Sequence, residues 1–154
     1  MSVSYNTYTN PVAKPIFAVN RGLSFLAPIA DLLIRCWVAW IFFRSGLTKI
    51  QSMDSTITLF KYEYNVPLLE AEVAAYIGTW SELILPVLLA VGLAGRYTAV
   101  ALFIFNIAAV ISYPDMNPAG VRQHQAWGIM LLIIIGHGPG KISLDYLIER
   151  FFRR

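Results

Sequence analysis

Four stretches of the chain are apolar over a length that suits a membrane-spanning helix. They cover residues 26–47, 73–93, 97–113 and 121–137, and about 20 apolar residues at 1.5 Å per residue cross the core of a bilayer. Hydrophobic residues make up 57% of the 154 residues and charged residues only 14%, whereas an average soluble domain has roughly 25% charged residues. The sequence therefore predicts an all-α integral membrane protein, a four-helix bundle covered by lipid.

Shorter segments flank and connect the predicted spans. We expect residues 1–25 to form a cytoplasmic N-terminal segment, residues 26–137 the four-helix transmembrane bundle, and residues 138–154 a cytoplasmic interfacial helix. In the last segment, Ser143 is a suitable N-cap, and the apolar residues that follow predict an amphipathic helix lying on the membrane surface. Residues 56–64 predict another short amphipathic helix, at the opposite end of the bundle. A proline that follows shortly afterwards would end it.

Lysine and arginine residues outside the spans are distributed unevenly. The two termini and the turn at 95–96 carry seven of them on one side, against four on the other. Because positively charged loops tend to remain in the cytoplasm, we expect a multi-pass protein of the bacterial inner (plasma) membrane with both termini cytoplasmic. These cations are placed to meet lipid headgroups and form no patch for nucleic acid. The expected partners are membrane lipids and either other proteins or further copies of this chain.

Arg35 and Glu82 are charged residues near the middle of the first and second predicted spans. A charge at bilayer depth costs about 2.5–3.5 kcal/mol on insertion scales, so such a residue usually faces a partner or a wet cavity. Asp31 precedes Arg35 by about one helical turn, and a guanidinium can serve two acceptors at once. We therefore expect an Arg35–Glu82 ion pair at the centre of the bundle, with Asp31 beside it.

Asn106 and His124 place polar groups at a similar depth on the third and fourth spans. Together with Arg35, Glu82 and Asp31 they predict a polar centre. Two interpretations of it remain open: the polar groups fix the register and packing of the helices, or they handle a proton or a ligand. No metal site is expected, because the histidines and carboxylates lack the spacing of metal ligands.

Trp37, Trp80 and Trp127 lie deep in the predicted spans, although tryptophan usually prefers the membrane interface. They either pack within the bundle or line a pocket for a flat ring, such as the head of a quinone. No cofactor is identified from the sequence, and a quinone is the candidate that these rings suit. The single cysteine, Cys36, cannot form an internal disulfide, which argues against dithiol chemistry.

These features together resemble the DoxX family of small bacterial membrane proteins. The residues that carry the resemblance are Arg35, the Phe-Phe-Arg-Ser-Gly run that ends at Gly46, Lys49, Glu82 with the apolar run up to Arg96, and residues 138–145. The resemblance implies a four-helix membrane bundle with both termini inside. It also implies that Glu82 is the family's acidic residue and Arg35 its basic partner, with Lys49 and Arg96 as further candidates.

Three functions agree with this sequence. The first, which we favour, is an accessory or anchoring subunit of a redox- or stress-related membrane system, since members of the DoxX family resemble partners of such systems. The second is the membrane subunit of a quinone-linked oxidoreductase of the thiosulfate:quinone type, after which the family is named. The third is a small-molecule or ion carrier, which would have to dimerise because four helices without an internal repeat make a small transporter. Whether the protein is an enzyme stays open.

Overall fold

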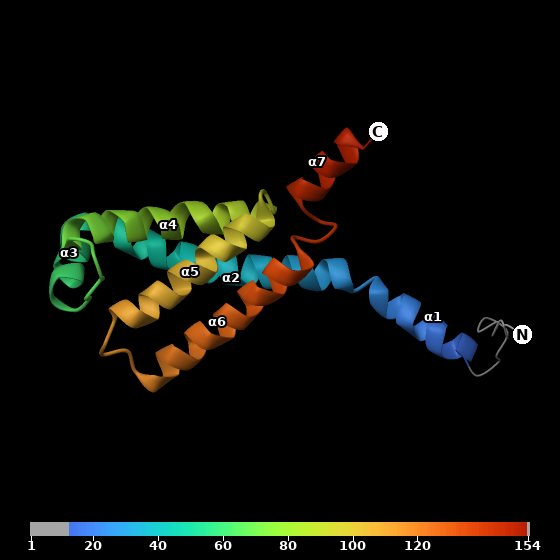
Figure 1. Cartoon of the computed structure of the whole chain (residues 1–154), viewed down its shortest axis with the longest axis horizontal. Helices are drawn as coiled ribbons and strands as arrows, with labels where there is room; N and C mark the ends of the chain where they lie inside the picture. The colour runs from blue at the N-terminus through green and yellow to red at the C-terminus, as the bar shows by residue number, and fades with distance from the viewer. Residues whose placement is uncertain (1–12, 154) are drawn as a thin grey trace, which may run out of the picture.

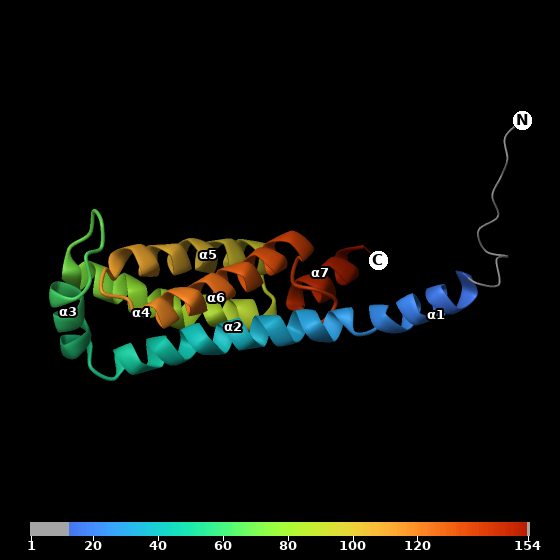
Figure 2. The same ribbon diagram turned by 90° about the horizontal axis from the view of Figure 1, so that it is seen from below.

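The computed structural model describes residues 13–153, which contain helices and no β-strand. In this range the helices are α1 (Ala13–Ser24), α2 (Ala27–Ile50), α3 (Met53–Tyr62), α4 (Ala71–Val91), α5 (Gly95–Ser112), α6 (Pro118–His137) and α7 (Leu144–Phe152). The long helices α2, α4, α5 and α6 lie side by side, with α3 at one end and α1 and α7 at the other (Figures 1 and 2). Residues 1–12 of the predicted N-terminal segment and Arg154 lie outside the described residues.

Three segments of the described chain are long and apolar enough to cross a membrane: Val19–Ile50, Ala71–Val91 and Gly95–Ser112. They coincide with the first three predicted spans, and the first begins earlier than predicted because its apolar run includes the end of α1. The fourth predicted span coincides in position with α6. Helix α6 has 20 residues and rises about 30 Å, which is long enough to cross a membrane. Its first turns are polar, so α6 is not among the three segments that are apolar enough to be candidate spans.

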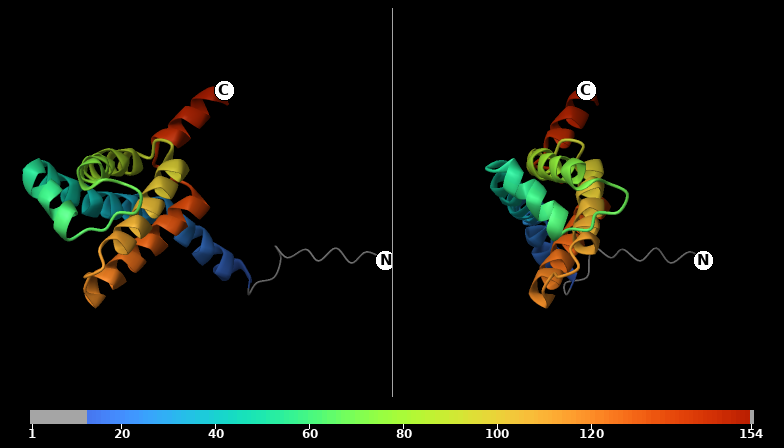
Figure 3. Two further views of the ribbon diagram at one scale, coloured as in Figure 1. Left: turned by 60° about the vertical axis from the view of Figure 1, so that its left-hand side comes forward. Right: turned by 90° about the vertical axis from the view of Figure 1, so that its left-hand side faces the viewer.

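The core lies where the α2–α4 pair meets the α5–α6 pair, and Figure 3 shows the two pairs crossing obliquely. The buried apolar residues there are Val38, Ala39 and Phe42 of α2, Leu89 of α4, Ala99 and Leu102 of α5, and Leu131 and Ile134 of α6. Many large apolar side chains instead point outward, among them Leu33, Ile84 and Ile104. An outer surface of this kind suits lipid and would be unfavourable in water.

Helices α2 and α4 run antiparallel, and their backbones approach closely at Gly46. A Cβ atom on Gly46 would lie 3.0 Å from both the carbonyl carbon and the Cβ of Glu82, so the contact depends on the missing side chain. Farther along the pair, Arg35 lies against Gly92, where a Cβ atom would collide with the guanidinium group. These two contacts define which residues of α2 and α4 lie opposite each other.

Helix α3 closes one end of the bundle by packing on α4. The Ser52 side chain caps α3 by accepting a hydrogen bond from the backbone N–H of Ser55 at 3.3 Å, which satisfies a donor at the helix start. Phe60 is buried against α4. The helix predicted at residues 56–64 is thus confirmed, but this cap makes it begin at Met53.

The beginning of α7 is tied to the opposite end of the bundle. The carboxylate of Asp145 accepts hydrogen bonds from the backbone N–H groups of Ala94 and Gly95 at 2.8 and 2.7 Å, where the start of α5 favours a negative charge. The Ser143 hydroxyl accepts one from the backbone N–H of Tyr146 at 3.2 Å, which confirms the predicted N-cap. Helix α7 itself buries none of its residues and extends away from the bundle (Figure 1).

The contact at Gly46 predicts a position-specific effect of adding one methyl group. Gly46→Ala forces α2 and α4 apart, because the atoms in the way belong partly to the backbone of α4, and we expect it to lower the free energy of unfolding by about 1–3 kcal/mol. Gly136→Ala in α6 is the matched control, since a Cβ there meets nothing within 4 Å and alanine favours a helix. Unfolding in mixed micelles measures the stability of each variant. Equal stabilities would contradict the close approach of α2 and α4 at Gly46.

Candidate functional site

Lys49 and Glu82 form an ion pair inside the bundle. Lys49 Nζ lies 2.5 Å from Glu82 Oε2 and 2.8 Å from Ser45 Oγ, and the two charged side chains are only 14% and 8% exposed. Side chains on a helix lean toward its N-terminus. Lys49 stands in the last turn of α2, so its side chain points back between the helices, where it neutralises a carboxylate that would otherwise be unpaired in apolar surroundings.

The predicted Arg35–Glu82 ion pair is wrong. The prediction placed the midpoints of the first two spans at the same depth, which set Glu82 close to the level of Trp37. In the structure Glu82 lies against Gly46, which is farther along α2 than Arg35 by about 16 Å at 1.5 Å per residue. Lys49, which the family resemblance offered as a further candidate, is the basic partner instead.

Arg35 is buried at the opposite end of the bundle, near the start of α7. Its Nη2 donates a hydrogen bond to the carbonyl of Ile142, and the residue is 1% exposed. Within residues 13–153, its Nε and Nη1 atoms have no hydrogen-bond partner. Asp31 lies at the same end, because a Cβ atom on Gly140 would come within 2.8 Å of its carboxylate. Arg35 therefore binds the connection between α6 and α7, Asp31 lies beside that connection, and both are separate from Glu82.

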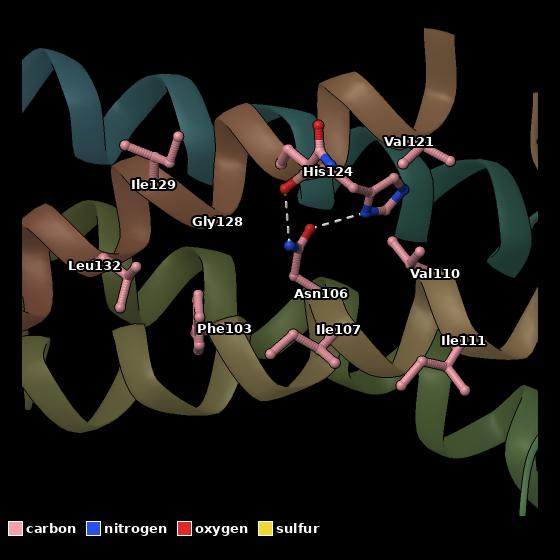
Figure 4. A pocket seen from close by; sticks show the side chains of 11 residues that line it. Phe103, Asn106, Ile107, Val110, Ile111, Val121, His124, Gly128, Ile129 and Leu132 are labelled. Atoms are coloured by element: carbon pink, nitrogen blue, oxygen red, sulfur yellow. Dashed lines mark hydrogen bonds between the residues drawn. The ribbon is translucent and has the colours of Figure 1, made fainter. Parts of the chain in front are cut away.

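Asn106 and His124 link α5 to α6, and the structure brings these two predicted residues together (Figure 4). Asn106 Nδ2 donates to the backbone carbonyl of His124 at 2.9 Å, which leaves Asn106 Oδ1 to pair with His124 Nδ1 at 2.8 Å. An amide oxygen only accepts, so Nδ1 of His124 carries the hydrogen of this bond. The ring of His124 packs edge-on against Trp127, with 4.7 Å between centroids.

A cavity of about 240 Å³ connects the ion pair to His124 and Trp127. Its polar and aromatic walls are Phe42, Ser45, Lys49, Tyr64, Glu82, His124 and Trp127. A second cavity, of about 180 Å³, shares Lys49, Glu82 and Tyr64 with the first and extends toward α3. The ion pair thus lines open space on two sides, an arrangement that permits a ligand or water to contact it. We call the first space the ion-pair cavity.

Tyr64 closes the ion-pair cavity at the end where α3 lies. Its ring stacks on Phe60 and Tyr113, with centroids 4.5 and 5.0 Å away, and the backbone N–H of Asn65 donates to the Ser112 carbonyl at 2.7 Å. Burial, together with the negative charge of Glu82, raises the pKa of Tyr64. A tyrosine hydroxyl is protonated at neutral pH even without this shift, so Tyr64 has a hydrogen-bond donor to offer in the cavity wall.

The tryptophans divide into two groups that the sequence did not separate. Trp127 lines the ion-pair cavity. Trp37 and Trp80 are 61% and 52% exposed and face the apolar outside, so they do not pack within the bundle. Neither of them lines this cavity. The position of a residue along a span indicates its depth, but the rotation of the helix decides whether it faces lipid or the interior.

Sequence reasoning left Ser45, Lys49 and Tyr64 out of the polar centre. Ser45 and Lys49 stand four residues apart, on one helix face, and Gly46 beside them marks where a neighbouring helix approaches; this spacing is a signal that could have found them. Tyr64 lies between helices and carries no such periodicity. Among the described residues, no group of three or more His, Cys, Asp or Glu side chains is arranged to hold a metal ion.

Comparison with known proteins adds three findings. A family model described as DoxX matches residues 30–114, a range that contains Lys49, Glu82 and Asn106 and ends before His124. A protein of Haemophilus influenzae that carries the name "Uncharacterized protein" is 32% identical over 133 residues, which cover 80% of this chain and 86% of the relative. No solved structure matches the chain.

A double-mutant cycle distinguishes the observed ion pair from the predicted one. Lys49→Met leaves the Glu82 carboxylate buried and unpaired, which we expect to lower the free energy of unfolding by about 3–5 kcal/mol. Adding Glu82→Gln removes that charge, so the two effects should be non-additive by about 1 kcal/mol or more. Arg35→Met with Glu82→Gln is the control cycle, and we expect additivity within about 0.5 kcal/mol. A larger coupling for Arg35 than for Lys49 would refute the assignment.

Proposed function

Since the chain belongs to the DoxX family of membrane proteins, we propose that it is an integral subunit of a redox-related system in the bacterial inner membrane, with α6 as its fourth span. Both termini then lie in the cytoplasm, as the excess of lysine and arginine at that end favours. The side chain of Lys49 points into the bundle, so Lys49 is not a loop cation of the outer side. The excess of lysine and arginine on the cytoplasmic side is therefore larger than the sequence count.

We further propose that the ion-pair cavity receives the head of a quinone. The observation that supports this is the convergence of Lys49, Glu82, His124 and Trp127 on one cavity. An apolar cavity of about 150 Å³ accommodates benzene, so about 240 Å³ suffices for a substituted ring. Reduction of a quinone adds two electrons and two protons, and the electrons would come from a partner protein.

Each polar residue then has a role that its contacts support. Two of the three N–H donors of Lys49 are directed at Glu82 and Ser45, and the third can donate to a quinone oxygen. Glu82 holds the ammonium group in place and lies within reach as a proton carrier. Trp127 offers an aromatic surface against the ring, and the edge of His124 stands beside it.

Tryptophan fluorescence tests this binding site. A protein that keeps Trp127 and has Trp37, Trp40 and Trp80 replaced by Phe, placed in lipid nanodiscs, should show saturable quenching by a short-chain benzoquinone. Glu82→Gln should weaken the binding about tenfold, the worth of one charge-assisted hydrogen bond, whereas Glu72→Gln, on the exposed start of the same helix, should not.

A second single-tryptophan protein controls for collisional quenching by quinone that is dissolved in the lipid. A protein that keeps only Trp80, which is 52% exposed on the outside, should show quenching that rises linearly with the quinone content of the bilayer. If Trp127 behaves in the same linear way, or if Glu82→Gln has no effect on saturable quenching, the quinone proposal fails.

The accessory or anchoring role is a second proposal, and α7 favours it. This helix buries none of its residues, and Leu147, Phe151 and Phe152 are 57%, 76% and 81% exposed. We propose that α7 is an interfacial amphipathic helix on the cytoplasmic surface and that a partner protein docks beside it, near α1. Helices α1 and α7 lie at the same end of the bundle, opposite α3 (Figure 2).

Purification from native membranes tests the docking role. We expect a partner protein to copurify with the full chain in a constant ratio, and Phe152→Glu to release it, because a charge at an apolar contact is costly. Phe17→Glu on α1 tests whether the same partner also covers that helix. A chain that always purifies from native membranes without a partner protein would contradict an anchoring role.

A further inference from the structure

An apolar groove of about 490 Å³ lies between α5 and α6 (Figure 4). The residues that frame it include Phe103, Ile107, Val110, Ile111, Ile129 and Leu132. Several of them face the outside of the bundle, with Ile111 63% and Ile129 60% exposed. On helices that span a membrane, such a groove opens sideways into the lipid and not into water.

The floor of this groove is polar. The Asn106–His124 hydrogen bonds cross it from α5 to α6 (Figure 4), and Asn106 is only 4% exposed. Gly128 makes room for this amide, since a Cβ atom there would already lie 3.4 Å from Asn106 Nδ2. Gln125, which follows His124 in the sequence, also lines the groove, and the other lining residues are apolar. A largely apolar lining with a few hydrogen-bonding groups is the pattern of a site for an amphiphilic molecule.

His124 belongs to the walls of both spaces, the α5–α6 groove and the ion-pair cavity. The cavity, at about 240 Å³, takes a ring but has no room for a long tail, whereas the groove has twice that volume and leads to the lipid. We infer that the ligand is an amphiphile whose apolar tail lies in the α5–α6 groove while its head reaches the ion-pair cavity past Asn106–His124. This inference rests on the proposed function and specifies the ligand class.

The residues of the rim favour a tail over a second protein helix. Helices that associate within a membrane use small residues to approach closely, but the rim carries Ile107, Ile111, Ile129 and Leu132. Gly128 is small, but it lies at the floor and is buried. Branched side chains on both sides of a gap leave space that a flexible chain fills and a rigid helix does not.

Two matched substitutions on α5 test the tail site. Val110→Phe places a ring in the groove, and Val100→Phe places the same ring on the outer face, where Val100 is 39% exposed and lines no part of the groove. The binding of two benzoquinones with the same head, one with a decyl tail and one with a methyl group, is followed by saturable quenching in the Trp127-only protein.

The expected result depends on the tail. Val110→Phe should weaken the decyl quinone about tenfold or more, because even one excess methylene in an apolar site changes binding by about that factor, and should leave the methyl quinone unchanged. Unchanged binding of the methyl quinone also shows that the variant is folded. Val100→Phe should bind both quinones as the parent protein does.

The other outcomes separate this inference from the proposed function. If Val110→Phe weakens both quinones equally, or neither, while Glu82→Gln still reduces binding, the groove is not the tail site and the proposed quinone site stands. If Val110→Phe instead dissociates a dimer, measured by light scattering in detergent, a second copy covers the groove and the inference is wrong. If neither quinone gives saturable quenching in the parent protein, both proposals fail.

Discussion

The close contact between α2 and α4 at Gly46 determines which residues the buried charges of these two helices face. Because Gly46 has no side chain, the backbone at Glu82 can approach it, and this register brings Lys49 to Glu82 and Arg35 to Gly92. Lys49 and Glu82 thereby pair at one end of the bundle, and Arg35 binds the carbonyl of Ile142 at the other. A shift of a few residues between the two helices would leave a carboxylate unpaired in apolar surroundings, which is strongly unfavourable.

An ion pair in a tightly packed interior could serve structure alone, and apolar residues of similar size often replace such pairs without loss of stability. The Lys49–Glu82 pair differs because it lines two cavities and shares one of them with His124 and Trp127. Buried charges that line open space in a membrane protein are typical of sites that bind ligands or transfer protons. This is why we propose a ligand site at the Lys49–Glu82 pair.

The fold could be predicted largely because membrane-spanning length and helix caps are local properties. The first three spans and the cap at Ser143 follow from short windows of sequence, and the similar depth of Asn106 and His124 on their spans agrees with their contact in the structure. The partner of Glu82 could not be predicted, because it depends on the axial shift between two helices. The outward direction of Trp37 depends in the same way on helix rotation, which tertiary contacts set and composition does not encode.

Solid-state NMR on the protein in bilayers measures the central contact directly. With ¹⁵N at the side chain of Lys49 and ¹³C at the carboxyl group of Glu82, rotational-echo dipolar dephasing should be strong, as the 2.5 Å between Lys49 Nζ and Glu82 Oε2 requires. The same experiment with ¹⁵N in the guanidinium of Arg35 should show no dephasing. Strong dephasing from Arg35 and none from Lys49 would contradict the register of α2 and α4 and the site built on it.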